Sequence, residues 1–349
     1  MSDTPQPTAQ PTHIVLQPRE SLFGRFGKLL LVALGLCLLA MMGMAAQVQR
    51  YFGEGDGPPE KYHSLSKEAT DKIAVVRVSG AIMEGDTFVE DQLEAASKDD
   101  SIKAVVLRID SPGGTVTYSD RLYHKAVELR EERDLPVVVS MGSLCASGGY
   151  YLAMAVGDQE DAIFAEPTSW TGSIGVVIPS YNFSGIMRTV GVQDLSVSSG
   201  ELKLMGSPTR IRTDKETAVL QELVDISYEG FKEIVKSGRP AFRDDPAALD
   251  AVATGQIFTA KQALENGLVD KIGFLEAAVE RAAELAGVST SSVRCVEYNK
   301  QVTPIEQILG AQTPQQPASA GLDVRALIEL STPRAYYLST MAPVLLRSK

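Results

Sequence analysis

Two glycine-rich turns, each directly after a short apolar run, hold the groups best suited to chemistry in this sequence. They are DSPGGT at residues 110–115 and SGG at residues 147–149. A serine that starts a helix is most often an N-cap, and paired glycines are most often a tight turn. If both turns lie at one edge of a single sheet, the N–H groups of Gly114 and Gly148 instead form an oxyanion hole beside Ser147. The pattern therefore predicts either two structural turns or acyl transfer by a serine nucleophile.

A serine nucleophile needs a group that removes its proton. No histidine follows His124, so a Ser-His-Asp triad would have to recruit His124 from the helix after the first turn. A lysine whose pKa is lowered by desolvation is a recognised substitute, and Lys203 is the candidate because apolar residues flank it in ELKLM. TGSIG at residues 171–175 can supply a hydroxyl that orients such a lysine. Two other interpretations stay open: Lys203 as a surface lysine, and Cys145 as the nucleophile rather than a small buried side chain.

Composition excludes several classes of protein. The chain has 349 residues, of which 44% are hydrophobic, and a net charge of −11. Such an acidic chain lacks the basic face that a nucleic-acid partner requires. The three cysteines and three histidines are dispersed along the sequence, so we expect no metal site and no disulfide framework. No motif for an organic cofactor is present, and we expect none.

An apolar run near the N-terminus predicts a membrane anchor. Residues 29–46 are uncharged, and with residues 26–28 they are long enough to cross a bilayer. Three basic residues precede the run, whereas only Arg50 closely follows it. Because positive charge stays on the cytoplasmic side, we expect a single-pass inner (plasma) membrane protein with a cytoplasmic N-terminus. Its catalytic domain would then lie on the outer, periplasmic side. Cleavage of the run as a signal peptide is the alternative.

The rest of the sequence predicts one globular domain with tails. Short apolar strands alternate with helical segments, which predicts an α/β fold with a mostly parallel sheet. We therefore expect a disordered tail at residues 1–25, a transmembrane helix at 26–46, a linker at 47–70, the globular domain at 71–287 and a flexible extension at 288–349.

Several motifs, in this order, resemble the signal peptide peptidase A family of membrane-anchored serine proteases, the S49 type. The resemblance covers about residues 73–284 of the globular domain. It is carried by DSPGG at 110–114, ASGGYY at 146–151, TGSIGV at 171–176, SGELKLMGSP at 199–208, SYEGF at 227–231 and GQIFTAKQALENGLVDKIG at 255–273.

The resemblance implies a role for each site residue. Ser147 would be the nucleophile, Lys203 the general base and Ser173 the group that orients the lysine. The amides of Gly114 and Gly148 would form the oxyanion hole. The implied fold is the crotonase/Clp-protease type, a spiral of β-β-α units, in its short, single-domain form.

The resemblance also implies partners. Short forms are octamers in which the serine and lysine of one site come from neighbouring subunits. The implied substrates are remnant signal peptides or other apolar peptides at the lipid bilayer, with an S1 pocket that favours small or apolar side chains. The extension after Val288 has no match in the family core, and it would be regulatory, a substrate-like strand in the binding groove, or inert.

Two other functions compete with proteolysis. A crotonase-type acyl-CoA enzyme would use the same oxyanion hole for a thioester enolate. The expected outward topology, where coenzyme A is scarce, and the absence of an evident carboxylate at the site oppose it. The third possible function is that of a non-catalytic oligomeric membrane scaffold, and the presence of Ser147 and Lys203 opposes it.

Overall fold

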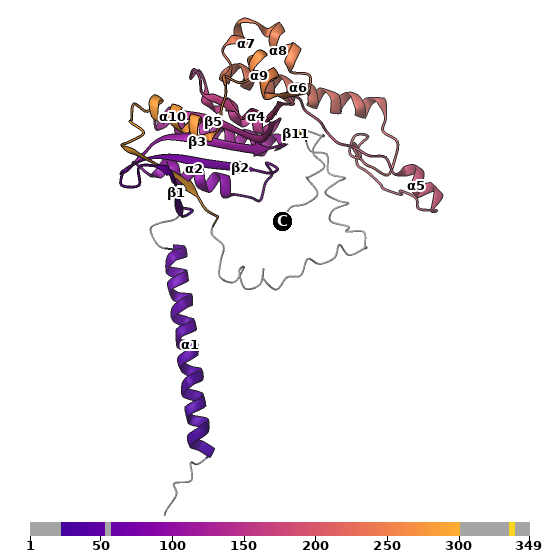
Figure 1. Ribbon diagram of the computed structural model, residues 1–349. Coiled ribbons are helices and arrows are strands. Elements are labelled where there is room, and N and C mark those ends of the chain that lie inside the picture. Colours follow the sequence, from indigo (N-terminus) through magenta and orange to yellow (C-terminus); the bar gives the residue numbers. More distant parts are fainter. Residues whose placement is uncertain (1–21, 53–56, 301–334, 339–349) are drawn as a thin grey trace, which may run out of the picture. The chain divides into compact units, whose positions relative to one another are not determined.

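The computed structural model describes residues 22–52, 57–300 and 335–338. The chain divides into two compact units, Met1–Asp56 and Gly57–Lys349. The first unit contributes one described helix, and the second contains the sheet and the remaining elements (Figure 1).

Helix α1 (Leu22–Phe52) contains the predicted membrane span. Its segment Phe26–Gly43 has a mean hydropathy of 2.1, and none of this segment is buried within the protein. By length and composition, α1 fits either a membrane anchor or a signal sequence. Of the tail predicted at 1–25, residues 22–25 belong to this helix, and residues 1–21 lie outside the described part of the chain.

A large, mostly parallel sheet confirms the predicted α/β class. Its strands run in the order β1-β10-β2-β3-β5-β6-β9, and among these only the β1–β10 pair is antiparallel. The short strands β7 and β8 extend it beyond β5, while β4 and β11 form a separate pair. The bounds are β1 Glu60–Leu65, β2 Asp71–Ser79, β3 Ile102–Ser111, β4 Gly113–Thr115, β5 Val137–Ala146, β6 Ile163–Ala165, β7 Trp170–Gly172, β8 Ile257–Thr259, β9 Lys271–Ile272, β10 Val293–Tyr298 and β11 Tyr336–Leu338.

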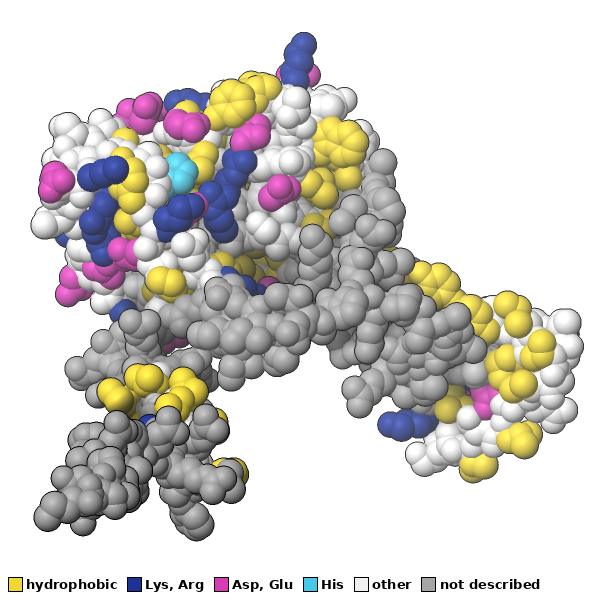
Figure 2. Space-filling model, turned by 60° about the horizontal axis from the view of Figure 1, so that its bottom comes forward, with side chains coloured by type: hydrophobic (Ala, Val, Ile, Leu, Met, Phe, Trp, Pro, Cys, Tyr) yellow, Lys and Arg dark blue, Asp and Glu magenta, His cyan; other side chains and the backbone are white. Residues whose placement is uncertain are grey.

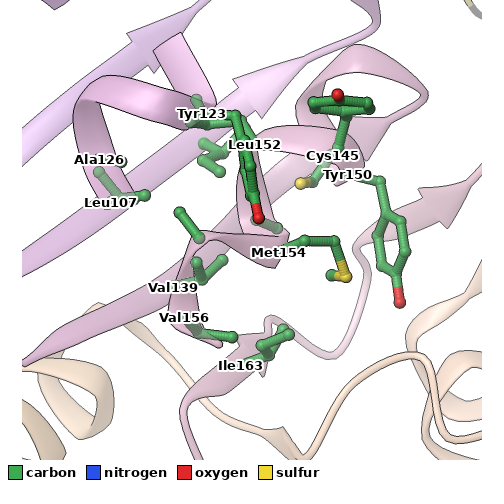
Figure 3. Close-up of a cluster of buried hydrophobic side chains, with 14 of the residues drawn as sticks. Leu107, Tyr123, Ala126, Val139, Cys145, Tyr150, Leu152, Met154, Val156 and Ile163 are labelled. Carbon is green, nitrogen blue, oxygen red and sulfur yellow. The ribbon is translucent and has the colours of Figure 1, made fainter. Parts of the chain in front are cut away.

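Both faces of the central strands are buried, as expected of a parallel sheet covered by helices. On β2, Val76 belongs to the larger core with side chains from α2, α3 and α4, whereas Val75 faces a second core with α10. Figure 3 shows part of the larger core, in which Cys145, Tyr150 and Met154 lie among aliphatic side chains. The helices are α2 Phe88–Lys98, α3 Val116–Glu132, α4 Gly148–Ala153, α5 Ser184–Thr189, α6 Asp214–Gly238, α7 Ala241–Asp244, α8 Pro246–Val252, α9 Ala260–Glu265 and α10 Leu275–Leu285, with a short 3₁₀ turn at Met154–Val156.

Two segments predicted to lie outside the globular domain are part of its sheet. The expected linker at 47–70 contains β1, and the expected extension at 288–349 contains β10, which lies between β1 and β2. β10 was missed because it is a short strand with polar residues on either side, so its alternating apolar residues are not conspicuous in the sequence. Its buried side chains, including Val293 and Cys295, pack against α10 and the neighbouring strands. The domain therefore continues beyond both predicted limits.

An ion pair at the start of β3 gives a stability prediction. Partial burial opposes ionisation of Asp99, but hydrogen bonds from Lys72 Nζ (2.8 Å) and from the hydroxyl and amide of Ser101 outweigh it, and they lower the pKa of Asp99 to about 2. A carboxyl whose folded-state pKa is depressed stabilises the fold above its unfolded pKa of about 4, and this stability is lost as the pH falls toward 2.

We therefore expect Asp99→Asn to lower the melting temperature of the detergent-solubilised full chain at neutral pH. It should also flatten the decline of that temperature between about pH 4 and pH 2. Asp100→Asn is the matched control, because the Asp100 side chain is 98% exposed. Equal acid sensitivity of the Asp99→Asn variant and the unsubstituted chain would contradict the assignment.

Candidate active site

Ser147 lies at a sharp turn between β5 and α4. Its backbone has φ 55° and ψ −115°, a conformation that is strained for a residue with a side chain. A strained serine between a strand and a helix is the arrangement of a nucleophile elbow. Ser147 occupies the N-cap position of α4, but its side chain makes no capping hydrogen bond, so capping does not account for the serine. Its Oγ is buried, and no described residue forms a hydrogen bond with it.

The two glycine-rich turns meet, as the sequence predicted. A Cβ built on Gly113 would lie 2.6 Å from the amide nitrogen of Gly148 and 3.0 Å from Ser147 Cβ. A Cβ built on Gly148 would lie 3.1 Å from the amide nitrogen of Gly114. Both candidate oxyanion donors therefore lie beside Ser147. Neither Gly114 nor Gly148 has room for a side chain.

The segment around Ile82 holds the first turn in position. Ile82 N–H donates to the Gly113 carbonyl at 2.9 Å, and Thr115 N–H donates to the Ile82 carbonyl at 3.0 Å. Any side chain on Gly114 would collide with Ile82, because a Cβ there would lie 1.7 Å from the Ile82 carbonyl oxygen. Gly113 also has a positive φ of 98°, which favours glycine.

The third motif, TGSIG, packs directly against the nucleophile turn. Ser147 N–H donates to the Gly172 carbonyl at 2.8 Å, and the Thr171 hydroxyl donates to the Cys145 carbonyl at 2.6 Å. Ser173 follows at a positive φ of 52°, and its N–H donates to the Gln256 carbonyl at 2.7 Å. Ser173 is thus adjacent in the chain to the residue that fixes the backbone of Ser147.

Lys203 does not reach Ser147 within one chain. It is an exposed residue in the turn-rich segment between α5 and α6. Because Ser147 Oγ has no hydrogen-bond partner among the described residues, the lysine amine of the same chain is not within bonding distance. The structure therefore brings together Ser147, the amides of Gly114 and Gly148 and the backbone of Ser173, and it leaves the candidate base, Lys203, apart.

The other nucleophile and base are unsuited to the site. Burial, reinforced by Asp110, raises the pKa of the Cys145 thiol, so this residue stays a protonated core side chain. The side chain of His124 is 62% exposed, and its Nδ1 lies 2.9 Å from the carbonyl oxygen of Asp120. It is not bonded to Ser147 Oγ in the described part of the chain.

Two further features belong to the site, and the sequence analysis missed the first of them. One is Ser119 on α3, whose buried hydroxyl has no partner among the described residues and would lie 2.4 Å from a Cβ on Gly148. The other is β11, which pairs antiparallel with β4 and places Tyr337 opposite Gly114. Helical spacing in α3 marks Ser119 as inward-facing. The position of β11 agrees with one of the three alternatives given for the extension after Val288, a strand in the binding groove, although no local pattern marks which residues form it.

Comparison with known proteins identifies the family. Residues 130–289 match the sequence model of peptidase family S49. A Synechocystis protein named as a protease is 38% identical over 222 residues, which cover 64% of this chain and 77% of that protein. A signal peptide peptidase SppA homologue from Enterococcus faecium is 35% identical over 61% of this chain and 59% of its own length. A chloroplast serine protease, SPPA of Arabidopsis thaliana, is 30% identical over 68% of this chain but only 36% of its own length.

The family match covers the turns that carry Ser147 and Ser173 and extends through α6 to α10. The match to the Synechocystis protein spans most of that relative, whereas the matches to the other two span less than two thirds of them. The resemblance drawn from the motifs is confirmed: the chain belongs to peptidase family S49, the serine proteases that include the signal peptide peptidases.

Proposed function

We propose that this protein is a membrane-anchored serine endopeptidase that uses a Ser147–Lys203 dyad to cleave remnant signal peptides or other apolar peptides. Its domain would be the crotonase/Clp-protease spiral, extending over about residues 57–300. The observation that carries the proposal is the buried, unpartnered Oγ of Ser147, held in a strained turn beside the amides of Gly148 and Gly114.

The proposed reaction is acyl transfer in two steps. Ser147 Oγ attacks the peptide carbonyl carbon, and its proton passes to the Lys203 amine. The amides of Gly114 and Gly148 stabilise the negative charge on the carbonyl oxygen. The C–N bond then breaks, the leaving amine takes the proton, and water hydrolyses the serine ester. Ser173 would orient the lysine.

Lys203 would come from a neighbouring subunit of a homo-oligomer, for which the family resemblance implies an octamer. The segment that carries it exposes many apolar side chains, and α5 has no buried residue. Leu195 is 81% exposed and Val197 is 99% exposed. Figure 2 shows hydrophobic side chains gathered on the segment around α5, at the right of the view. Such a surface needs a partner, and a lysine acts as a base only where a dry environment lowers its pKa.

The membrane part of the proposal rests on α1. As an uncleaved anchor it would hold the catalytic domain on the periplasmic side, because the basic residues precede the apolar segment. A site close to the bilayer suits apolar peptides that remain in the membrane.

A peptide suits this site better than an acyl-CoA thioester. The groove beside Ser147 already accepts an extended chain, β11, which pairs with β4 on one side and bridges Val177 on the other. Backbone pairing on two sides recognises a peptide. A thioester offers no comparable ladder of donors and acceptors.

The proposal is tested with the full chain in detergent, given an apolar signal peptide in one assay and an acyl-CoA in another. We expect peptide hydrolysis that Ser147→Ala removes and no thioester turnover. Ser143→Ala is the matched control, because Ser143 is an exposed serine of the same stretch, and its rate should be unchanged. Peptide cleavage that survives Ser147→Ala would overturn the mechanism. A folded, oligomeric wild-type chain without any cleavage would favour the scaffold.

A further inference from the structure

The loop that carries Lys203, residues 199–208, contains no buried residue. None of residues 175–215 is buried in the single chain, so no apolar core holds this part of the protein in place. The loop is a series of tight turns, one of which joins the Ser207 N–H to the Leu204 carbonyl at 3.0 Å. Because a catalytic group must be held in a fixed position, this loop needs a support of another kind.

Arg210 ties the Lys203 loop to a buried carboxylate. Its Nη2 donates at 2.7 Å to the carbonyl of Leu204, the residue after Lys203. The same guanidinium donates to both carboxylate oxygens of Glu216, with Nη1 3.0 Å from Oε2. The side chain of Glu216 is only 2% exposed. Hydrogen bonds from Arg210 and from the Thr213 amide lower the pKa of Glu216 to about 2, so the carboxylate stays ionised at neutral pH.

Glu216 belongs to a helix that is anchored in the domain. It is the third residue of α6, in which Leu220 and Phe231 are also buried. Phe231 is part of the larger core. The contacts therefore run without a break from the core through α6, Glu216 and Arg210 to the residue after Lys203.

Capping of α6 does not account for Arg210. The cap is a reciprocal pair between Thr213 and Glu216, in which Glu216 Oε2 accepts from the Thr213 amide at 2.9 Å and the Glu216 amide donates to the Thr213 hydroxyl at 3.2 Å. This cap is complete without any side chain from position 210. Removing an ion pair from water costs free energy that its attraction hardly exceeds. The value of Arg210 therefore lies in the geometry that it fixes.

We propose that Arg210 is a positioning residue for the reaction: held by Glu216, its guanidinium sets the place of the Lys203 loop and so of the amine that this loop presents to a serine. This rests on the proposed function, in which Lys203 is the base. Arg210 acts through Lys203 and needs no contact with the substrate. A displacement of about 1 Å at a reacting group is enough to lower a rate by about 100-fold.

The first measurement compares peptide hydrolysis by the detergent-solubilised full chain and its variants. We expect Arg210→Gln to lower kcat by about 100-fold with little change in KM, because glutamine cannot span the Leu204 carbonyl and Glu216. Arg210→Lys should lie between the two, since an ammonium meets the carboxylate without the planar fork of a guanidinium. Arg188→Gln is the matched control, because Arg188 is an exposed arginine on α5, and its kcat should be unchanged.

Two outcomes of this measurement have different meanings. A normal kcat for Arg210→Gln would overturn the positioning role and leave the serine–lysine mechanism intact. Absence of cleavage by the unsubstituted chain would instead refute the proposed function.

The second measurement places the substitution on one kind of subunit at a time. Mixed oligomers of Ser147→Ala and Lys203→Ala subunits have complete sites only where the lysine comes from the Ser147→Ala subunit. We expect Arg210→Gln on the Ser147→Ala subunit to lower the rate of the mixture by about 100-fold, and the same change on the Lys203→Ala subunit to leave it unaltered. Both mixtures contain Arg210→Gln in equal amount, so damage to folding or assembly would affect them alike. Equal rates in the two mixtures would show that Arg210 does not act through the lysine of its own chain.

Discussion

Subunits carrying Ser147→Ala and subunits carrying Lys203→Ala are expected to be inactive when each is made alone and active when they are made together. Loss of either the nucleophile or the base should lower kcat/KM by roughly 10³-fold or more. In mixed oligomers, some sites pair an intact serine from one subunit with an intact lysine from its neighbour. For equal amounts and random assembly, about a quarter of the sites are complete.

The physical reason is the separation seen in the single chain. Ser147 Oγ is buried with no partner among the described residues, while Lys203 is exposed. One copy supplies an elbow without a base, and the apolar surface around the lysine is available to a second copy. If two copies share a site as proposed, complementation needs no change of fold.

The measurement is peptide hydrolysis by co-expressed, co-purified subunits that carry different affinity tags. The control pairs unsubstituted chains with chains that carry both substitutions, which reports how dilution affects the assay. Lys215→Ala is the matched single control, because Lys215 is an exposed lysine whose amine is paired with Glu201; it should retain activity. Failure of the mixture to exceed either parent would show that serine and lysine do not meet between subunits.

The half of the site built from adjacent strands was predictable from sequence. A short apolar run followed by paired glycines and a helix recurs at residues 110–115 and 147–149, and parallel strands bring such turns to one edge of a sheet. The structure places β3 beside β5, so Gly114 and Gly148 meet as expected. Local pattern and sheet topology together sufficed here.

The half that depends on long-range pairing was not predictable. β10 joins β2 across the length of the domain, and β11 reaches β4 from the far C-terminus. Nothing local distinguishes Tyr337 from any other tyrosine, because its partners Tyr151 and Phe231 lie in distant helices. The exposure of Lys203 was one of two alternatives that the sequence left open, since flanking leucines are equally compatible with a buried site and with an exposed surface.

Gly148→Ala is expected to lower kcat by about 10²- to 10³-fold with little change in KM, as loss of one oxyanion donor does. The new Cβ would lie 3.1 Å from the Gly114 amide nitrogen and 2.4 Å from Ser119 Oγ. It would therefore crowd the space between the two donors, and relief of that crowding must move the Gly148 amide. Peptide-hydrolysis assays on the folded oligomer measure kcat and KM, and its thermal melting curve measures any loss of stability.

Two further variants separate a blocked oxyanion hole from general damage to the fold. Gly230→Ala adds a methyl group in α6 where no atom lies within 4 Å, so it should leave kcat unchanged and raise stability by roughly 0.5–1 kcal/mol. Adding Ser119→Ala to Gly148→Ala removes the 2.4 Å collision but keeps the Cβ close to Gly114. If the loss of activity came from packing strain alone, this double variant would recover the full rate; if it comes from the displaced donor, stability returns while kcat stays low. Full activity of Gly148→Ala itself would mean that the Gly148 amide does not serve the oxyanion.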